Sequence, residues 1–388
     1  MMQNSAPLAP LVAPGPELTP DEITRYQRHL GLPEVGVEGQ RRLKNARVLL
    51  VGAGGLGSPV LHYLAAAGVG TLGLIDDDVV EMSNLQRQVI HSTLDLGRPK
   101  VASAADRATA LNPHVTVVAH PQRLGVDNAL ELFGDYDLIV DGTDNFATRY
   151  LVSDAAEILG KPVVWGAILR FHGQLAVFWA GKGPTYRDLF PEPPDPGSVP
   201  SCAEAGVLGV LPGTIGTLMA TEVLKLILGR GESLLGRVAI YDALGARLES
   251  VAIRPDPDRA PVTELRSIEF ACAVGAPTVT ETLDVPAFRA LLERRDAGEL
   301  ELAVVDVREP WEQSLGTVPG ALSVPLGQIH QRGAAALPPW VRDCDVVLYC
   351  AAGVRWGLAL EILRPDFVGG EVTLRHLGGG YTAWESTP

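Results

Sequence analysis

The stretch that constrains this sequence most is residues 47–57, R-V-L-L-V-G-A-G-G-L-G, because it combines a strand, a tight turn and a helix start. Residues 47–51 predict a buried strand, and the run S-P-V-L-H-Y-L-A-A-A-G that follows predicts a helix. Free N–H groups and the positive end of the helix dipole face whatever lies at such a turn. A Cβ would hold a phosphate off the backbone, so glycine is needed there. The turn therefore predicts a phosphate site at Gly52, Gly54 and Gly57.

A second predicted strand, L-G-L-I, ends in three acids about twenty residues further on. At this spacing the first of them, Asp76, is expected to bind a ribose hydroxyl. The pattern indicates a nucleotide but neither its identity nor the chemistry. A glycine-rich turn without a ligand is the alternative.

Length and composition limit the possible functions. With 388 residues and 46% hydrophobic content, the chain is expected to form two or three domains with apolar cores. The net charge of −14 argues against nucleic-acid and anionic-membrane binding, which need a basic surface. The N-terminus does not resemble a signal peptide. The charge-free stretch 205–221 contains Pro212 and four glycines, so it is expected to be buried rather than membrane-spanning.

The four cysteines are widely spaced and include no C-x-x-C pair; they are Cys202, Cys272, Cys344 and Cys350. Four such residues are too few for a disulfide scaffold and offer no zinc knuckle. A reducing cytosol fits this usage best, so we expect a cytoplasmic protein.

Strands and helices alternate along the first half of the chain, which predicts a Rossmann-like, mostly parallel sheet with helices on both faces. Ligands bind beyond the carboxyl ends of the strands in such sheets. Here these ends carry Gly52, Asp76 and residues 141–145, so one site is implied. Antiparallel strands are expected at 173–179 and 236–253, joined through a proline-rich loop that carries Cys202.

The composition shifts near residue 255, and a second α/β pattern begins at residue 283. The predicted division is a disordered tail (1–20), a nucleotide-binding domain (21–258), a linker (259–282) and a small α/β domain (283–388).

Three charged residues indicate nucleotidyl transfer rather than hydride transfer. Arg87 in S-N-L-Q-R and Lys100 in G-R-P-K are placed to neutralise charge that develops on a triphosphate. Asp144 in D-G-T-D-N offers a hard oxygen ligand for Mg²⁺ on the same phosphates. The alternative, an NAD-dependent oxidoreductase, needs no such residues, and no hydride-transfer base follows.

Residues 21–255 resemble the adenylyltransferases of the ubiquitin-activating-enzyme superfamily, in the branch that activates ubiquitin-fold sulfur carriers. The matching stretches are R-Y-Q-R-H, G-A-G-G-L-G, L-I-D-D-D-V-V-E-M-S-N-L-Q-R-Q, G-R-P-K, D-G-T-D-N and S-C-A-E-A-G-V-L-G. The resemblance implies a homodimer in which Arg28 reaches into the partner's site. It also implies ATP and Mg²⁺ binding by Gly55, Asp76, Asn84, Arg87, Lys100 and Asp144, with Asn145 beside it.

Residues 283–388 resemble a rhodanese, through D-V-R-E-P-W-E, V-P-G-A-L-S-V-P-L, C-A-A-G-V-R and L-G-G-G-Y-T-A-W. The two families in this order resemble the fused adenylyltransferase–sulfurtransferases. That resemblance implies a carrier ending in Gly-Gly, which is adenylylated and then converted to a thiocarboxylate by a cysteine persulfide. A cysteine desulfurase is a suitable persulfide donor. Carriers of this kind serve molybdopterin, thiamine and cysteine synthesis and tRNA thiolation, and the sequence does not choose among them. Carrier activation for protein conjugation and a non-catalytic scaffold are the alternatives.

The cysteines differ in the chemistry expected of them. Cys350 ends a strand and opens a loop into a helix, where N–H groups, the helix dipole and Arg355 would stabilise an anionic sulfur. Cys344 stands between two acids that raise a thiol pKa, so it is expected to be inert. By the resemblance, Cys202 forms a thioester or acyl disulfide with the carrier, although no base or cation is visible beside it.

The sequence departs from the first family at a structural zinc site. Most of its members carry two C-x-x-C pairs, the first of which is expected near T-Y-R-D-L-F-P, where Thr185 and Asp188 stand instead. The second is expected near residues 255–263, which contain no cysteine. No zinc is therefore expected, and these loops are expected to be held by packing or by the dimer.

Overall fold

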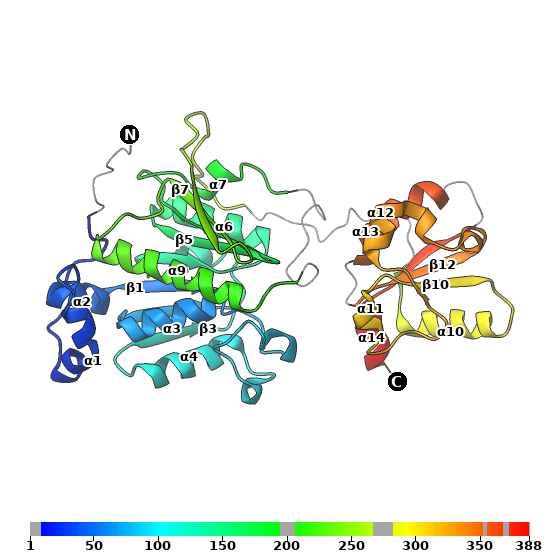
Figure 1. The fold of residues 1–388 in the computed structure, drawn as a ribbon, viewed down its shortest axis with the longest axis horizontal. Coiled ribbons are helices and arrows are strands. Elements are labelled where there is room, and N and C mark those ends of the chain that lie inside the picture. The colour runs from blue at the N-terminus through cyan, green and yellow to red at the C-terminus, as the bar shows by residue number, and fades with distance from the viewer. Residues whose placement is uncertain (1–8, 195–205, 267–281, 352–354, 368–371, 388) are drawn as a thin grey trace. The chain divides into compact units, whose positions relative to one another are not determined.

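The computed structural model describes residues 9–194, 206–266, 282–351, 355–367 and 372–387. These residues form two compact units, the first within 9–266 and the second within 282–387. Each unit has its own sheet and is described by itself (Figure 1).

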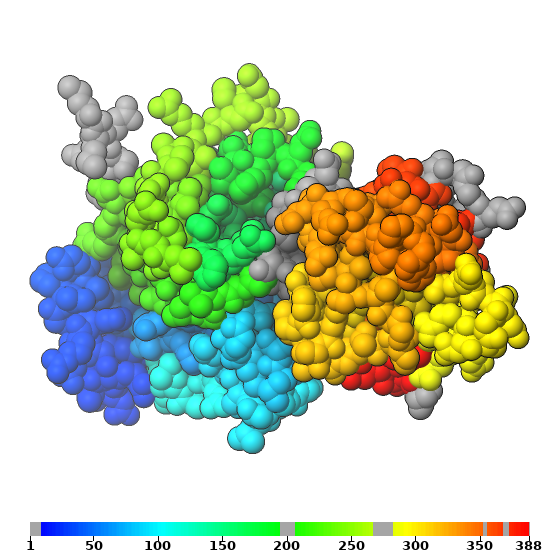
Figure 2. Space-filling view, turned by 45° about the vertical axis from the view of Figure 1, so that its right-hand side comes forward, coloured from blue at the N-terminus to red at the C-terminus, as the bar shows by residue number. Residues whose placement is uncertain are grey.

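The first unit is built on an eight-stranded sheet in the order β3-β2-β1-β4-β5-β6-β7-β8. The first five strands in this order, β3-β2-β1-β4-β5, are parallel to their neighbours. Strands β5, β6, β7 and β8 pair with one another antiparallel. The strands are β1 (Arg47–Val51), β2 (Thr71–Ile75), β3 (Thr116–His120), β4 (Leu138–Asp141), β5 (Val163–Leu169), β6 (His172–Phe178), β7 (Arg237–Asp242) and β8 (Arg247–Ala252). The turn between β7 and β8 projects at the top in Figures 1 and 2.

Helices cover both faces of this sheet, as the alternating pattern predicts. They are α1 (Pro20–Leu30), α2 (Gly36–Asn45), α3 (Gly57–Ala67), α4 (Lys100–Leu111), α5 (Ala129–Gly134), α6 (Phe146–Leu159), α7 (Tyr186–Leu189) and α9 (Val210–Leu228), with short 3-10 turns η1 (Met82–Asn84) and η2 (Thr93–Asp95). Alternate residues of β1 serve the two faces: Val48 and Leu50 pack with α3, α4 and α9, whereas Leu49 and Val51 pack with α5 and α6. The mostly parallel fold expected from the sequence is confirmed.

Helix α9 is long and apolar enough to span a membrane by length and composition, with a mean hydropathy of 1.4. However, 56% of its apolar window is buried inside the unit, where Leu211, Ile215 and Met219 join the core. It packs against α3 and β5, as a core helix does. Pro212 lies in its first turn, where a missing N–H costs nothing.

The N-terminal segment differs from the predicted tail in its second half. Val12 is buried in the first core, and the Leu11 N–H donates to the Leu226 carbonyl at 3.1 Å. Arg42 Nη1 donates to the Val12 carbonyl at 2.6 Å. Residues 9–19 therefore pack against α2 and α9. Their proline-rich composition suggested disorder, but the apolar Leu11 and Val12 between the prolines join the core.

The second unit has a five-stranded sheet in the order β11-β10-β12-β13-β9, in which all the paired strands are parallel. Its strands are β9 (Thr282–Leu283), β10 (Leu302–Asp306), β11 (Leu322–Ser323), β12 (Asp345–Tyr349) and β13 (Leu374–Leu377). Its helices are α10 (Val285–Asp296), α11 (Pro310–Gln313), α12 (Leu326–Arg332), α13 (Arg355–Leu363) and α14 (Gly380–Ser386), with 3-10 turns η3 (Gly333–Ala336), η4 (Pro339–Asp343) and η5 (Arg364–Phe367). Apolar clusters on both faces of β10 and β12 form its core.

Candidate active sites

The glycine turn joins β1 to α3, as predicted. Gly52 has a φ of +95°, which favours glycine, and its N–H donates to the Ile75 carbonyl. A Cβ on Gly57 would lie 2.1 Å from the Gly52 carbonyl oxygen. The backbone at Gly57 therefore packs directly against that of Gly52. Glycine is required at residue 57 for this close approach as well as for phosphate binding.

A pocket of about 420 Å³ opens at the carboxyl ends of β1, β2 and β4, which is within the usual size of small-molecule sites. It gathers most of the predicted nucleotide residues. Its lining includes Gly52, Gly54, Gly55, Asp76, Asn84, Arg87, Lys100, Asp144 and Asn145. Gly57 begins α3 directly behind this lining.

Asp76 and Lys100 face the pocket with fixed partners. The Asp76 carboxylate accepts the Ala53 N–H at 2.8 Å and the Asp78 N–H at 2.9 Å. Burial raises the pKa of Asp76, and these bonds and the Lys100 charge oppose the rise without cancelling it. Lys100 is 6% exposed, and its ammonium donates to Asp78 Oδ2 at 2.7 Å. Asp78 therefore balances the lysine charge, a role that the sequence did not assign.

His91 is a second residue that the motifs missed. Its Nε2 lies 3.0 Å from the Ala53 carbonyl and its Nδ1 lies 3.0 Å from Ser103 Oγ. Burial lowers the pKa of His91, so the ring is neutral near pH 7 and tethers the glycine turn to α4, the helix that starts at Lys100. Its position after N-L-Q-R-Q-V-I was the only signal available.

Two of the predicted ligands also have local structural roles. The Asn145 side chain caps α6, accepting the Thr148 N–H at 2.8 Å. The Asn84 side chain accepts the Glu81 N–H at 3.3 Å and closes η1. By contrast, the Asp144 carboxylate is exposed to the pocket and has no hydrogen bond or ion pair within the described ranges.

The two predicted arginines differ in position. Arg87 lines the pocket, and its Nη1 donates to the Ser83 carbonyl at 3.1 Å. Arg28 lies exposed on α1, outside the pocket lining, and α1 and α2 form the blue edge of the molecule in Figure 2. Within one copy of the described chain, Arg28 therefore does not take part in the pocket.

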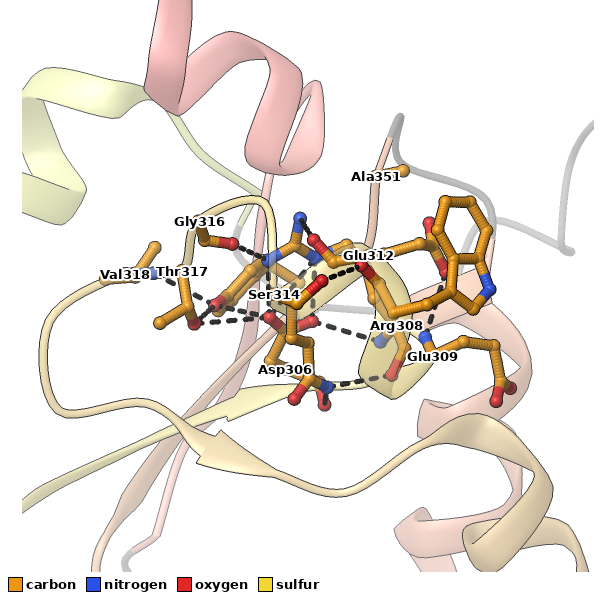
Figure 3. Close-up of polar contacts among 12 residues, drawn as sticks. Asp306, Arg308, Glu309, Glu312, Ser314, Gly316, Thr317, Val318 and Ala351 are labelled. Atoms are coloured by element: carbon orange, nitrogen blue, oxygen red, sulfur yellow. Dashed lines mark hydrogen bonds and ion pairs between the residues drawn. The ribbon is translucent and has the colours of Figure 1, made fainter. Parts of the chain in front are cut away.

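A buried ionic network organises the second unit beneath the loop that follows β10 (Figure 3). Arg308, which is 3% exposed, donates to both carboxylate oxygens of Asp306 and to the Gly316 carbonyl. The Tyr349 hydroxyl donates to Asp306 Oδ2 at 2.7 Å, and burial raises the pKa of Tyr349 to about 12. Satisfied on all sides, this pair fixes the ends of β10 and β12 relative to each other.

Cys350 follows β12, but its thiol is only 1% exposed and belongs to the core. The Cys350 carbonyl accepts the Tyr381 N–H at 2.8 Å, and a Cβ on Gly380 would lie 2.3 Å from the same oxygen. The loop after Cys350 continues through residues 352–354, which lie outside the described residues. Sulfur chemistry at Cys350 therefore requires the thiol to be exposed at some stage.

Arg355 begins α13, and its two terminal nitrogens donate to the Glu312 carboxylate at 2.6 Å each. Its guanidinium thus has a carboxylate partner, and its role beside an anionic sulfur stays a prediction.

Of the other cysteines, the structure describes Cys344. Burial raises the pKa of Cys344, with smaller contributions from nearby acids, which agrees with an inert thiol. Cys202 and Cys272 lie outside the described residues.

The two stretches that hold zinc ligands in the family, around Thr185 and Asp188 and at residues 255–263, lie together in the first unit. Arg259 Nε donates to Asp188 Oδ1 at 3.1 Å, and both of its Nη atoms donate to Glu157 Oε1 at 3.2 Å. The Asp256 N–H also donates to Asp188, and Asp188 Oδ2 accepts from Thr185. This polar cluster, Asp188–Arg259–Glu157, lines a second pocket of about 490 Å³ at the far end of α6 from Asp144. The loops are thus held by ion pairs, which the sequence expectation of packing or dimer contacts did not include.

Breaking the polar cluster is expected to destabilise the first unit. The Glu157 and Asp188 side chains are only 6% and 2% exposed, so Arg259→Met leaves two buried carboxylates without their cation. Loss of one partner of a buried pair costs about 3 kcal/mol, or roughly 6–12 °C in Tm. Arg266→Met, which removes the exposed pair with Glu264, is the matched control and should change Tm by less than about 2 °C. Equal shifts in calorimetry would contradict a structural role for the cluster.

The same cluster gives a pH dependence. Burial alone would raise the pKa of Asp188, but hydrogen bonds from Thr185, Asp256 and Arg259 lower it below its usual value. A carboxyl with a lowered folded pKa stabilises fully above its unfolded pKa and loses that contribution as the pH falls. The Tm difference between wild type and Arg259→Met is therefore expected to shrink below about pH 4.

Comparison with known proteins assigns both units to families. Residues 26–262 match the ThiF family, and residues 288–387 match the rhodanese-like domain. A crystal structure of E. coli MccB has a TM-score of 0.55 at 22% identity, covering 62% of this chain and 75% of that one, which is a similarity of fold.

Curated relatives cover nearly the whole chain. MoeZ of Mycobacterium tuberculosis, a probable adenylyltransferase/sulfurtransferase, is 50% identical over 387 residues, 98% of this chain and 97% of its own length. MOCS3 of Mus musculus, an adenylyltransferase and sulfurtransferase, is 43% identical, with 97% and 90% covered. A sulfur carrier protein adenylyltransferase of Thermus thermophilus is 54% identical over 70% of this chain and 98% of its own. The chain therefore belongs to the ThiF family, in the form whose adenylation domain is followed by a rhodanese-like domain, and is an adenylyltransferase and sulfurtransferase.

Proposed function

We propose that this enzyme adenylylates the C-terminal glycine of a ubiquitin-like sulfur carrier and then converts it to a thiocarboxylate. The pocket that brings the glycine turn, Asp76, Arg87, Lys100 and Asp144 to one edge of the sheet carries the proposal. The name of the T. thermophilus relative, a sulfur carrier protein adenylyltransferase, supports the class of substrate. Family membership removes the support for the NAD-dependent alternative.

In the first step, the carrier carboxylate attacks the α-phosphorus of ATP, pyrophosphate leaves, and the carrier acyl-adenylate forms. Asp76 is assigned to the ribose and the glycine turn to the phosphates. Arg87 and Lys100 stabilise the negative charge that develops on the phosphates. The exposed Asp144 carboxylate would hold Mg²⁺, a hard cation that would supply positive charge to the triphosphate. Asp78 is not assigned to the metal, since it pairs with Lys100.

In the second step, a persulfide on Cys350 attacks the acyl-adenylate carbonyl and AMP leaves, which gives a carrier acyl disulfide. A second thiol then attacks the sulfur of Cys350, releases the carrier thiocarboxylate and forms a disulfide with Cys350. Cys202 is the proposed second thiol. A cysteine desulfurase is the proposed source of the persulfide. Cys344 and Cys350 form no disulfide in the described part of the chain, which suits the reducing cytoplasm that we propose for this enzyme.

The assembly proposed is a homodimer without a structural zinc. Met82, Val89 and Leu94 are 63%, 61% and 91% exposed in the segment beside the pocket, where a second copy would cover them. In this dimer, Arg28 of each copy is proposed to reach into the partner's pocket, as the family resemblance implies. The polar cluster supports the absence of zinc, since Arg259 supplies positive charge between Glu157 and Asp188.

ATP–pyrophosphate exchange tests the adenylation step. The chain is incubated with ATP, Mg²⁺, labelled pyrophosphate and a small ubiquitin-fold protein ending in Gly-Gly from the same cell. Label is expected to enter ATP only when the carrier is present, and a carrier lacking its last glycine serves as the control. If no Gly-Gly carrier of the cell supports exchange, the proposed function is wrong. Mass spectrometry of the product separates a thiocarboxylate from attachment of the carrier to another protein.

A further inference from the structure

Arg149 is a charged residue in the wall of the nucleotide pocket that has no role in the scheme above. It lies on α6, one turn after the cap residue Asn145, and lines the pocket while being only 8% exposed. Its Nε and Nη2 donate to the Thr143 carbonyl at 3.2 and 2.9 Å. Its guanidinium carbon lies 5.2 Å from the ring centre of Phe146 and 6.0 Å from that of Trp165. Aromatic rings therefore flank the side chain while two of its donors bind the Thr143 carbonyl and it also hydrogen-bonds to Tyr186.

The energetic cost of this arrangement indicates a functional reason. A buried charge is expensive unless it is paired, and an apolar residue of similar volume is often as stable or more so. Within the described residues, Arg149 forms no ion pair within 4.0 Å, and its charge acts at longer range on the buried Asp141 carboxyl, where it opposes the rise in pKa that burial causes. It gains a hydrogen bond with Tyr186 and a paired hold on one backbone group, the Thr143 carbonyl.

That backbone group belongs to the loop that carries Asp144. The Thr143 N–H and hydroxyl donate to Asp141 Oδ1 at 3.0 and 2.7 Å, so the residue is held from its other side as well. The preceding Gly142 donates its N–H to the Val51 carbonyl and packs against the glycine turn. Arg149 is thus the side chain that fixes the last peptide before Asp144.

We propose that Arg149 is a positioning residue of the adenylation site, which holds the Thr143 carbonyl so that the Asp144 carboxylate faces the pocket. The proposal rests on the proposed function, since it assigns Asp144 to the magnesium of bound ATP. Displacing this loop by even 1 Å would weaken the alignment on which transfer depends.

Calorimetric binding of ATP in the presence of Mg²⁺, and separately in EDTA, tests this without relying on turnover. In the wild type, Mg²⁺ is expected to tighten ATP binding. Arg149→Met is expected to weaken binding about tenfold with Mg²⁺ and less than about twofold in EDTA, and to lower pyrophosphate exchange by roughly 10–100-fold. Arg149→Lys, which keeps the charge but not the paired donors, should lose at least about threefold of the Mg²⁺ effect. Arg47→Met is the matched control, because Arg47 also contacts an aromatic ring and donates to a backbone carbonyl but lies outside the pocket lining, so ATP binding should be unchanged.

The outcomes are distinct. Equal weakening with Mg²⁺ and in EDTA would mean that Arg149 contacts the nucleotide itself, and unchanged binding would mean that its hold on Thr143 is irrelevant; either result overturns the proposal. If Arg149→Met does not fold, Arg149→Lys decides, and an unchanged Mg²⁺ effect overturns it. A wild type that binds no ATP at all contradicts the proposed function instead.

Discussion

Cys350→Ala is expected to abolish thiocarboxylate formation while ATP–pyrophosphate exchange continues at the wild-type rate. The sulfur in the proposed scheme passes through this one atom, and alanine has no replacement for it. Exchange is expected to persist because the adenylation pocket lies in the other unit, which has its own core. Because the substitution only shortens a buried side chain, the rhodanese-like domain should remain folded.

The matched control is Cys344→Ala, which removes the second buried thiol of the same domain. Cys344 Sγ lies 3.6 Å from the Val341 carbonyl and opens no loop, so sulfur transfer should be retained. Thiocarboxylate is measured by mass spectrometry of the carrier after incubation with ATP and a persulfide donor. Product from Cys350→Ala at the wild-type rate would show that sulfur reaches the acyl-adenylate by another route.

Lys100→Met is expected to lower ATP–pyrophosphate exchange by about 10²–10³-fold. Removing one preorganised donor to developing charge has an effect of this size. The fold should tolerate the change, because methionine keeps the buried stem of the side chain and the Asp78 carboxylate left behind is 67% exposed. Thiocarboxylate formation should fall in parallel, since no acyl-adenylate is made.

Lys44→Met provides a control for the loss of a paired lysine in the same domain. Lys44, on α2, pairs with Glu22 at 2.8 Å and lies outside the pocket lining. ATP–pyrophosphate exchange should therefore be unchanged even if the stability of the domain falls. Near-normal exchange in Lys100→Met with intact folding would instead leave charge stabilisation to Arg87 and would remove Lys100 from the mechanism.

The parts of the site that are continuous in sequence could be predicted from it. The strand, glycine turn and helix of residues 47–67 are adjacent along the chain, so local periodicity and glycine spacing were sufficient. The carboxyl ends of parallel strands meet at one sheet edge, so Gly52, Asp76 and Asp144 could be expected in one pocket before any coordinates. The order of the two domains could also be predicted, because the motifs of each domain are continuous in the sequence.

The remainder depends on contacts between residues far apart in the chain. Arg259 pairs with Glu157 across 102 positions, and Arg355 pairs with Glu312 across 43. No local sequence pattern predicts such pairs, because each of these charged residues is indistinguishable in the sequence from one on the surface. Packing also decided that Val12 joins the core and that the Cys350 thiol is buried.

By itself, then, the sequence determined the fold class, the family and the edge of the sheet where a nucleotide would bind. Only the tertiary structure decided which charges are already paired, which carboxylate is exposed to the pocket and which arginine holds the loop behind it. The physical reason is that hydrogen-bonding patterns and hydrophobic periodicity are local and repeat along the chain. Pairing and burial of charges are properties of the three-dimensional neighbourhood.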